Sequence, residues 1–515
     1  MPARFAAKPL ELYARDGVAS AARFVTDGET LDGARFVERV IALSRVIRAT
    51  LRARRGSNVV CVACETSASA LACYLAIDVA GGVAVGLNSR WTATEATEAA
   101  GRCDAACAMV DAKHFEMWGR DAFNGCANVI DVDDAVERTS EGGSEEMEKA
   151  REDGACAYCF TSGTTGAAKA AVLTHEGVLA ATRAKIEVVG YERSDVYMHC
   201  APLYHVGGLS SAHASMSAGA SHVFMRSFDA ERALGAIERS GVTAFIAVPT
   251  MMAMLVDAAG ERVFDSVRKI LVGAGRLLRG QYEAIRRVFP NAKVTMAYGM
   301  SETTSSVTFL DPEDGRLVED PTFAGQAVRD VEVRADANGE LHVRGPIVML
   351  GYHGVDKSTT FDADGWFATG DLGRVAPAET SSACTGPRVW LYGRAKAVIK
   401  TGGENVSPEE VEGVINAHED VHTSVVVGAP HEKWGETVVA IVKLRQGTSL
   451  SVDEARPTVL EWCRDSRLAR FKIPKYILFT NEIPINMMGK FSRADVYDAH
   501  RVEIENEIAS TRPVN

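Results

Sequence analysis

Apolar side chains recur at helical spacing near the start of the chain. From Phe36 to Ile47 they stand three or four residues apart, with arginines between them. This period puts the apolar side chains on one face, so the pattern predicts an amphipathic helix over residues 32–54. A continuously apolar run at 58–63 then predicts a buried strand, and the apolar stretch 68–79 predicts a second helix.

Strand-like apolar runs alternate with helical stretches through the middle of the chain. The runs are 222–225, 244–248, 269–272 and 294–297. Such alternation is typical of an α/β fold with largely parallel sheets. Beyond residue 310 the pattern changes to successive alternating strands, which predicts a β-rich region that closes the large domain.

A smaller α+β unit is expected from residue 396 onward, which divides the chain into domains 1–395 and 396–515. Its predicted elements are the strand 398–400, the helix 408–418, the strands 424–430 and 437–444, and the helix 452–465. The predicted fold class is therefore α/β, with a large N-terminal domain of parallel-rich sheets and helices plus a β-rich subdomain, and a small α+β C-terminal domain.

Two polar segments interrupt these patterns. The acidic stretch 131–153 is expected to be a mobile, solvated connection. The stretch 376–388 is expected to be the tip of a hairpin that is longer than the turn requires. We interpret it as a loop insertion to which the sequence assigns no function.

The bulk composition narrows the classes of partner. At 515 residues the chain exceeds what one hydrophobic core supports, and its net charge of -12 disfavours nucleic acid and anionic membranes. No stretch reaches the ~18 uncharged apolar residues of a membrane helix, and the first residues lack the apolar core of a signal peptide. These features predict a soluble intracellular protein with small-molecule partners.

The eleven cysteines follow no framework spacing. Two C-x-x-C pairs, Cys61/Cys64 and Cys156/Cys159, are compatible with zinc or redox chemistry. The first pair lies in the apolar run VVCVAC, where cysteine packs as a small hydrophobe, and no histidine-rich segment follows at zinc-finger spacing. We therefore favour a reducing compartment over a metal site at these pairs.

The segment FTSGTTGAAK, residues 160–169, carries the strongest chemical signal. Glycine backbone N–H groups, hydroxyls and a lysine are the groups that surround a phosphate. The residues that supply them are Thr161, Ser162, Gly163, Thr164, Thr165, Gly166 and Lys169. The spacing differs from that of the ordinary P-loop. A surface turn of the same composition is the alternative interpretation.

Further segments, in a fixed order, combine glycine with polar or charged residues. They are PLYHVGGL, LVGAGRL, AYGMSET, TGDLG, YGR, TGGEN and NMMGKFSR. This set and its order resemble the acyl-adenylate-forming ligases, the superfamily of acyl-CoA synthetases, luciferases and peptide-synthetase adenylation domains. The resemblance spans nearly the whole chain, from the helix at 32–54 to Lys490.

The resemblance implies a nucleotide site built from several of these segments. FTSGTTGAAK looks like the phosphate loop of the family, although Ala168 stands where proline is usual. The implied nucleotide contacts are Gly273, Ala274 and Gly275 along adenine, Tyr298 stacked on it with the neighbouring Gly299 also in contact with the nucleotide, Asp371 on the ribose hydroxyls, and Arg394 as an anchor. In isolation, an aspartate in TGDLG is equally typical of a β-turn.

The resemblance also implies the catalytic groups. They are Lys490 as the catalytic lysine, Ser301 on the α-phosphate in place of the usual threonine, Glu302 with Thr164 as Mg²⁺ ligands, and His205 at the edge of the acyl pocket. A carboxylate beside a triphosphate requires a cation between them. In isolation, Ser-Glu-Thr is typical of a helix cap.

The implied reaction has two steps and uses ATP, Mg²⁺ and CoA. A carboxylate attacks the α-phosphate of ATP to give acyl-AMP and pyrophosphate. The small domain then rotates about Lys396, withdraws Lys490, and presents Gly402 and Gly403 of TGGEN to the chain of the incoming CoA thiol.

The acyl group is less clearly specified. APLYHVGGLSSAHA, AYGMSETTSSVTF and IKTGGENVSPEEVE are most similar to plant-type 2-succinylbenzoate–CoA ligases of phylloquinone and menaquinone synthesis. Such a diacid needs donors for its unreacted carboxylate. The candidate donors are His205, Ser210, Ser211, Ser305 and Ser306, and helix capping or backbone satisfaction is the alternative role of these serines.

Other functions stay open from the sequence. A 4-coumarate-like or medium-chain acyl-CoA ligase, or an enzyme that loads a carrier protein, would carry the same motifs. A nucleotide-binding module without turnover is disfavoured by the presence of Glu302, Asp371 and Lys490. The quinone-pathway reading implies a plastid location, and the other readings imply the cytoplasm.

Overall fold

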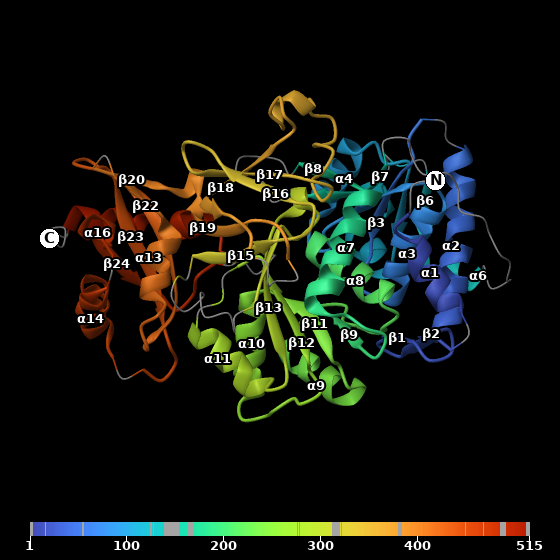
Figure 1. Cartoon of the computed structure of the whole chain (residues 1–515), viewed down its shortest axis with the longest axis horizontal. Coiled ribbons are helices and arrows are strands. Elements are labelled where there is room, and N and C mark those ends of the chain that lie inside the picture. Colours follow the sequence, from blue (N-terminus) through green and yellow to red (C-terminus); the bar gives the residue numbers. More distant parts are fainter. Residues whose placement is uncertain are drawn as a thin grey trace.

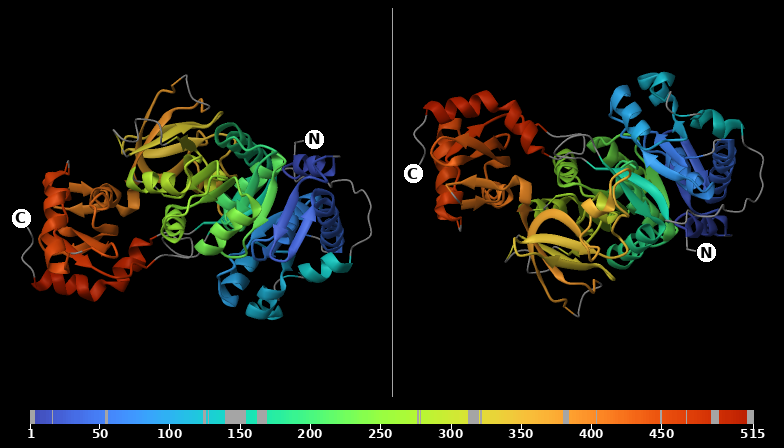
Figure 2. Two further views of the ribbon diagram at one scale, coloured as in Figure 1. Left: turned by 90° about the horizontal axis from the view of Figure 1, so that it is seen from below. Right: turned by 90° about the horizontal axis from the view of Figure 1, so that it is seen from above.

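A computed structural model describes most of the chain (Figure 1). The described residues are 4–15, 17–53, 56–123, 126, 128–138, 154–161, 169–275, 277, 279–311, 320, 322–379, 384–402, 404–448, 450–466, 468–484 and 491–510. The two ends of the chain lie at opposite ends of an elongated molecule, as both views of Figure 2 show.

The N-terminal part is built on a six-stranded sheet in the order β6-β5-β3-β4-β7-β8. Neighbouring strands are parallel except for β7 and β8. The strands are β3 (Val59–Ala63), β4 (Val83–Gly86), β5 (Cys107–Val110), β6 (Asn128–Asp131), β7 (Ala155–Phe160) and β8 (Ala170–Thr174). The apolar run at 58–63 thus forms the buried central strand β3, as its pattern predicted.

Six helices accompany this sheet. They are α1 (Ala7–Ala14), α2 (Gly33–Ala53), α3 (Ala68–Val79), α4 (Ala93–Arg102), α5 (Ala112–Trp118) and α6 (Val132–Arg138). The amphipathic α2 buries Phe36, Val40, Leu43 and Ile47 in one core cluster with the residues of α3. Helix α3 begins and ends at the residues that the sequence predicted, and Ser67 caps it by accepting from the Ala70 N–H.

A thirteen-stranded sheet runs through the rest of the large domain, in the order β16-β17-β18-β19-β15-β14-β13-β12-β11-β9-β10-β1-β2. Strands β1 and β9 to β13 pair in parallel, and strands β13 to β19 pair antiparallel, which matches the predicted change of pattern near residue 310. The strands are β1 (Arg23–Thr26), β2 (Glu29–Asp32), β9 (Val196–His199), β10 (Ser221–Phe224), β11 (Ala244–Ala247), β12 (Lys269–Gly273), β13 (Lys293–Tyr298), β14 (Thr308–Leu310), β15 (Phe323–Ala327), β16 (Glu332–Ala335), β17 (Glu340–Arg344), β18 (Phe367–Ala376) and β19 (Arg388–Arg394).

Helices cover the parallel half of this sheet, as Figure 1 shows. They are α7 (His175–Val189), α8 (Val206–Ser217), α9 (Ala230–Ser240), α10 (Pro249–Ala259) and α11 (Arg279–Val288). Helices α9 to α11 share one core cluster with β10 to β13. The fold is therefore α/β, as expected.

A five-stranded sheet forms the end of the molecule nearest the C-terminus. Its strands run β21-β20-β23-β22, with β24 beside β23. The elements are β20 (Ile399–Thr401), β21 (Glu404–Val406), α13 (Pro408–Ile415), β22 (Val421–His431), β23 (Gly435–Leu444), α14 (Val452–Asp465), β24 (Tyr476–Phe479), α15 (Arg493–Ala499) and α16 (Arg501–Ser510). A short 3-10 helix, η4 (Ala395–Ala397), joins β19 to this sheet.

The first polar segment differs from its prediction, whereas the second forms the tip of the β18–β19 hairpin, as expected. Val132–Arg138, in the stretch expected to be a mobile connection, form α6, whose start packs Val132 and Ala135 into the core around α2. The tip between β18 and β19 folds back onto β15, because the Gln326 amide donates to the backbone oxygens of Cys384 at 2.8 Å and Glu379 at 3.2 Å.

No helix among the described residues is long and apolar enough to cross a membrane. The eleven cysteines are all free, and all but Cys64 are buried. Cys61 lies inside strand β3, which is consistent with its interpretation as a small core hydrophobe, and Cys156 lies inside strand β7.

Candidate functional site

Three residues predicted to hold the nucleotide meet where β13, β18 and β19 come together. The Tyr298 hydroxyl donates to Asp371 Oδ2 at 2.8 Å, and Arg394 Nε lies 2.6 Å from Asp371 Oδ1. The antiparallel register of β18 and β19 puts Asp371 directly opposite Arg394. The sheet therefore brings together groups that are up to 96 positions apart in the sequence, from Tyr298 to Arg394.

Burial and charge keep the Tyr298 phenol protonated. Burial, followed by the negative charge of Asp371, raises the pKa of Tyr298 well above its usual value, so the phenol stays a neutral donor. Asp371 is 6% exposed, and its backbone N–H donates to the Thr369 hydroxyl at 3.1 Å. The carboxylate is thus held between a neutral donor and the Arg394 cation.

Glu302 lies on a one-turn 3-10 helix, η2 (Ser301–Thr303), just beyond Tyr298. Glu302 Oε1 accepts from the Tyr352 hydroxyl at 2.7 Å, whereas Oε2 has no hydrogen-bond partner among the described residues. The Tyr352 ring also lies 5.0 Å from Lys169 Nζ, within cation–π range. Tyr352 therefore links Glu302 to the end of the phosphate loop, a role that sequence reasoning missed.

The ends of the phosphate loop are fixed by the β7–β8 pair. The Thr161 N–H donates to the Lys169 carbonyl oxygen at 2.8 Å, which closes the loop at its base. Ser162, Gly163, Thr164, Thr165 and Gly166 lie outside the described residues, as do Gly403 and Lys490. Their predicted roles stay predictions.

The segment predicted to lie along adenine adopts a rare backbone conformation. Gly273 ends β12 opposite Ala297 of β13, so the segment begins beside Tyr298. Ala274 follows with φ +64, a left-handed conformation that side-chain-bearing residues rarely adopt. Such strain is maintained by the surrounding structure and concentrates at functional sites.

Gly299 lets two parts of the site approach closely. A Cβ at this position would lie 2.0 Å from the Ser305 carbonyl oxygen, so no other residue fits without backbone movement. Thr304 and Ser305 also have positive φ, at +47 and +91. The chain thus turns sharply after η2 and packs back against Gly299.

His205 has a structural role at the start of α8. It is the N-cap residue, and its Nδ1 accepts from the Gly207 N–H at 3.2 Å. Its contact with an acyl group stays a prediction. Of the other predicted donors, Ser210, Ser211 and Ser306 are buried and Ser305 is half-buried.

Gly402 directly follows β20 of the C-terminal sheet with φ +59, and its N–H donates to the Trp434 carbonyl oxygen at 2.9 Å. The predicted hinge residue, Lys396, lies inside η4 between Arg394 and this sheet. The predicted CoA-facing segment therefore belongs to the C-terminal sheet, whereas the nucleotide cluster belongs to the large one.

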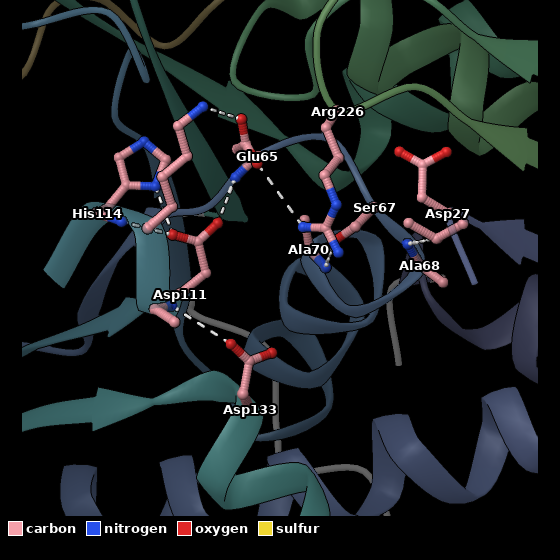
Figure 3. A network of polar contacts seen from close by, with 12 residues as sticks. Asp27, Glu65, Ser67, Ala68, Ala70, Asp111, His114, Asp133 and Arg226 are labelled. Carbon is pink, nitrogen blue, oxygen red and sulfur yellow. Dashed lines mark hydrogen bonds and ion pairs between the residues drawn. The ribbon is translucent and has the colours of Figure 1, made fainter. Parts of the chain in front are cut away.

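A second polar network lies at the carboxyl ends of the adjacent strands β3 and β5 (Figure 3). Asp111 accepts from the Glu65 N–H at 2.8 Å and from the His114 ring at 2.5 Å. Burial opposes its ionisation, but these donors hold the pKa of Asp111 below its usual value. Glu65 pairs with Lys113 and lies 3.7 Å from Arg226, which follows β10, so the network ties the two large sheets together.

The arrangement of the sheets matches the adenylate-forming enzyme fold of solved structures. The chain belongs to the AMP-binding enzyme family: that family matches residues 13–353, and its C-terminal domain matches residues 410–490. The expectation of an AMP-forming acid–thiol ligase is thereby confirmed at the level of the family.

Known relatives cover almost the whole chain. It is 34% identical to the chloroplastic/peroxisomal 2-succinylbenzoate–CoA ligase of Arabidopsis thaliana over 526 residues, which covers 90% of this chain and 91% of the relative. Among solved structures it resembles ATP-bound MatB from Rhodopseudomonas palustris, with TM-score 0.82, 27% identity and coverage of 96% and 99%. It also resembles o-succinylbenzoate coenzyme A synthetase (MenE) from Bacillus subtilis in complex with AMP, with TM-score 0.77, 25% identity and coverage of 99% and 99%.

Proposed function

We propose that this protein adenylates 2-succinylbenzoate with ATP and then transfers the acyl group to CoA. The observation that carries the nucleotide half of the proposal is the Tyr298–Asp371–Arg394 cluster beside Glu302. The acyl half is supported by the likeness to the Arabidopsis ligase over nearly the whole chain.

The nucleotide would bind with its ribose at Asp371 and its adenine against Tyr298. A carboxylate can accept from two adjacent ribose hydroxyls at once, which a neutral amide cannot do as strongly. The Tyr298 hydroxyl and Arg394 already orient both carboxylate oxygens. Ala274, with its left-handed backbone conformation, follows the end of β12, which lies next to the end of β13 that carries Tyr298.

Glu302 and Thr164 are the residues that would hold Mg²⁺. The free Oε2 of Glu302 fits a cation ligand, and Tyr352 fixes the other oxygen. When bound, the ion would neutralise phosphate charge and let a carboxylate stand next to it. Lys169, at the end of the loop, would supply a further positive charge.

In the first step a carboxylate oxygen of the acid attacks the α-phosphorus, and the bond to the β-phosphate oxygen breaks. Lys490 would stabilise the charge that develops between the acyl oxygen and the α-phosphate, and Ser301 would donate to that phosphate. The products are acyl-AMP and pyrophosphate. No proton transfer is needed in this step.

In the second step the CoA thiol loses its proton, attacks the acyl carbonyl carbon and displaces AMP. Lys490 must leave and the TGGEN segment must arrive, and both lie C-terminal to η4. One rotation about Lys396 would accomplish both changes. Gly402, with its positive φ and small size, would let the thiol chain pass close to the backbone.

Exchange of pyrophosphate into ATP across a panel of carboxylic acids tests the acyl assignment. We expect exchange with 2-succinylbenzoate, and weak exchange with cinnamates and medium-chain fatty acids. Strong exchange with either of those classes and none with 2-succinylbenzoate would replace the assignment by the alternative ligase. Exchange without thioester formation from CoA would point to a carrier-protein acceptor.

Lys490→Ala tests the division of the two steps. We expect adenylation to fall by 10²-fold or more, since a lysine at a developing charge contributes about 3 kcal/mol, while thioester formation from supplied acyl-AMP persists. Thermal unfolding and the KM for ATP serve as controls for folding and nucleotide binding. Adenylation at the normal rate in this variant would show that Lys490 has another role.

A further inference from the structure

Lys185 is a fully buried lysine for which the described part of the chain supplies no carboxylate partner. It lies in α7 with no exposed surface, and its Nζ donates to Ser210 Oγ of α8 and to Ser305 Oγ at 3.1 Å. Among the described residues, no aspartate or glutamate forms an ion pair with it. A buried ammonium without a counter-charge is costly, so it persists where something else compensates it.

The groups around Lys185 do not supply that counter-charge. His213 of α8 has its ring Nδ1 2.6 Å from the Thr182 hydroxyl. Burial lowers the pKa of His213 to about 4, so its ring is neutral near pH 7. The buried carboxylate of Asp78 is engaged by Arg4 and the Ala6 N–H instead. The remaining contacts of Nζ are hydroxyls.

One of the two hydrogen-bond arrangements of these hydroxyls leaves a Ser305 proton available to a ligand. An ammonium can only donate, so Ser210 and Ser305 both accept from Lys185. The Ser210 hydroxyl donates its own hydrogen bond to the Gly207 carbonyl oxygen at 3.5 Å. The Ser305 oxygen lies 3.3 Å from Ser306 Oγ, and when Ser306 donates there the Ser305 proton has no acceptor among the described residues.

Ser305 lies close to residues predicted to hold the nucleotide. It follows η2, which carries Ser301 and Glu302, and its carbonyl oxygen occupies the space that Gly299 leaves open. It is half-buried, whereas Lys185 behind it is fully buried. Its φ of +91 is a strained conformation of the kind that functional sites retain.

We propose that Ser305, backed by the Lys185 cation and fixed by Ser210, binds the unreacted carboxylate of a dicarboxylic acyl substrate. The inference rests on the proposed function and adds the residues that recognise the diacid. The carboxylate accepts from the Ser305 hydroxyl, and Lys185 supplies the buried positive charge that a monocarboxylate cannot use. Lys185 is thus a positioning residue that acts through Ser305.

The pH dependence of diacid use follows from the same arrangement. Burial lowers the pKa of Lys185 to about 7. As pH rises through this value the free enzyme loses the charge, so kcat/KM for a diacid falls. Use of a monoacid depends on the other ionisable groups of the site but not on the charge of Lys185. The pH profile of kcat/KM for a monoacid therefore lacks the fall near pH 7.

Lys185→Met is the direct test, because it keeps the length of the side chain and removes the charge. Substrates are 2-succinylbenzoate, its two analogues that each lack one carboxylate, and simple dicarboxylic acids with their monomethyl esters. We expect KM for diacids to rise about 10²-fold with kcat little changed. KM for monoacids and for ATP should stay constant, and the fall of diacid kcat/KM above pH about 7 should disappear.

Ser305→Ala and Ser215→Ala form a matched pair if the methionine variant is poorly folded. Ser215 is a buried serine of α8 whose hydroxyl donates to the Ala212 carbonyl oxygen instead. Ser305→Ala should raise KM for diacids selectively, and Ser215→Ala should not. Equal losses for diacids and monoacids in the Lys185 and Ser305 variants, or retention of diacid preference in both, would overturn the inference.

The two proposals fail in different ways. If wild-type protein adenylates no 2-succinylbenzoate but prefers other diacids over their monoesters, and Lys185→Met abolishes that preference, the acyl assignment falls and the carboxylate site stands. If wild-type protein prefers 2-succinylbenzoate and both variants keep the preference, the acyl assignment stands and the carboxylate site falls.

Discussion

At the scale of single residues, Tyr352 shows how the phosphate end of the site is organised. Its hydroxyl fixes one oxygen of Glu302 at 2.7 Å, while its ring faces the Lys169 ammonium at 5.0 Å. Burial and the charge of Glu302 raise its pKa, so it remains a donor at every physiological pH. One side chain therefore contacts both Glu302, the proposed metal ligand, and Lys169 at the end of the phosphate loop.

Tyr352→Phe is expected to weaken metal use while leaving the ribose contacts unchanged. The ring keeps its contact with Lys169, but Glu302 loses the donor that orients it. We expect kcat/KM for ATP to fall about 10-fold, the loss of roughly 1.5 kcal/mol for a hydrogen bond to a charged group. The Mg²⁺ concentration for half-maximal rate should rise in the same assay.

Tyr392→Phe is the matched control, because Tyr392 is 39% exposed on β19. It should leave both quantities unchanged. An unchanged Mg²⁺ requirement in Tyr352→Phe would mean that Glu302 is oriented by other groups.

The residues that sequence reasoning found and missed differ in one respect. Tyr298, Asp371 and Arg394 stand in motifs that pair glycine with a polar or charged side chain, and the sheet brings the three side chains into contact. Tyr352 and Lys185 stand in ordinary strand-like and helical surroundings. Their importance arises from contacts 50 and 120 positions away, which no local pattern records.

At the scale of elements, the helices and strands near α1 bury several histidines in their neutral form. Burial lowers the pKa of His175 and His213 to about 4 and of His222 to about 3, and it holds His199 well below its usual value. Opposing them, burial raises the pKa of Asp78 to about 6 despite its Arg4 partner.

These shifts predict acid sensitivity with a definite slope. Below pH about 6.5 the unfolded chain binds protons on four histidines that the folded chain leaves neutral, while folded Asp78 binds one that the unfolded chain does not. The difference of three protons lowers the free energy of unfolding by about 4 kcal/mol per pH unit as pH falls toward 4. Chemical denaturation at a series of pH values measures this slope.

His222→Gln isolates one member of the set. Its ring lies 2.9 Å from the Tyr13 hydroxyl and from the His199 ring, so an amide can replace some of its hydrogen bonds. The variant is expected to be less acid-sensitive by one proton, about 1.4 kcal/mol per pH unit. The same slope as wild type would show that His222 is not neutral in the folded protein.

Element boundaries were predictable where the pattern and the caps agree. Helix α14 spans Val452–Asp465 as predicted, because Ser451 and Glu454 form a capping box that fixes its start, and it continues through Pro457. Helix α6 was missed because its acidic residues obscure the two apolar side chains, Val132 and Ala135, that reach the core. Tertiary packing formed this helix against its polar composition.

At the scale of the whole molecule, one continuous sheet joins regions that the sequence pattern separates. The parallel strands and the later antiparallel strands belong to the same thirteen-stranded sheet, with β13 next to β14 at the change of direction. The spacing of apolar residues predicts each strand but not the strand with which it pairs, so the sequence could not predict that the sheet is continuous. Tyr298, at the end of β13, stands at that junction.

The chain leaves the large sheet through η4, and this sets the last prediction. Asp371 and Arg394 lie on one side of η4, while β20 and Gly402 lie on the other. If the C-terminal part turns about Lys396 between the two steps, the backbone there must change its φ and ψ. Lys396→Pro fixes φ near about −65° and hinders that change.

Lys396→Pro is therefore expected to slow thioester formation by 10-fold or more while pyrophosphate exchange continues at the wild-type rate. Lys396→Ala removes the same side chain but leaves φ free, so it should retain both reactions. Single-turnover assays that follow acyl-AMP and thioester separately distinguish the outcomes. Equal behaviour of the two variants would assign any loss to the missing charge, and unimpaired thioester formation in the proline variant would place the hinge elsewhere in the chain.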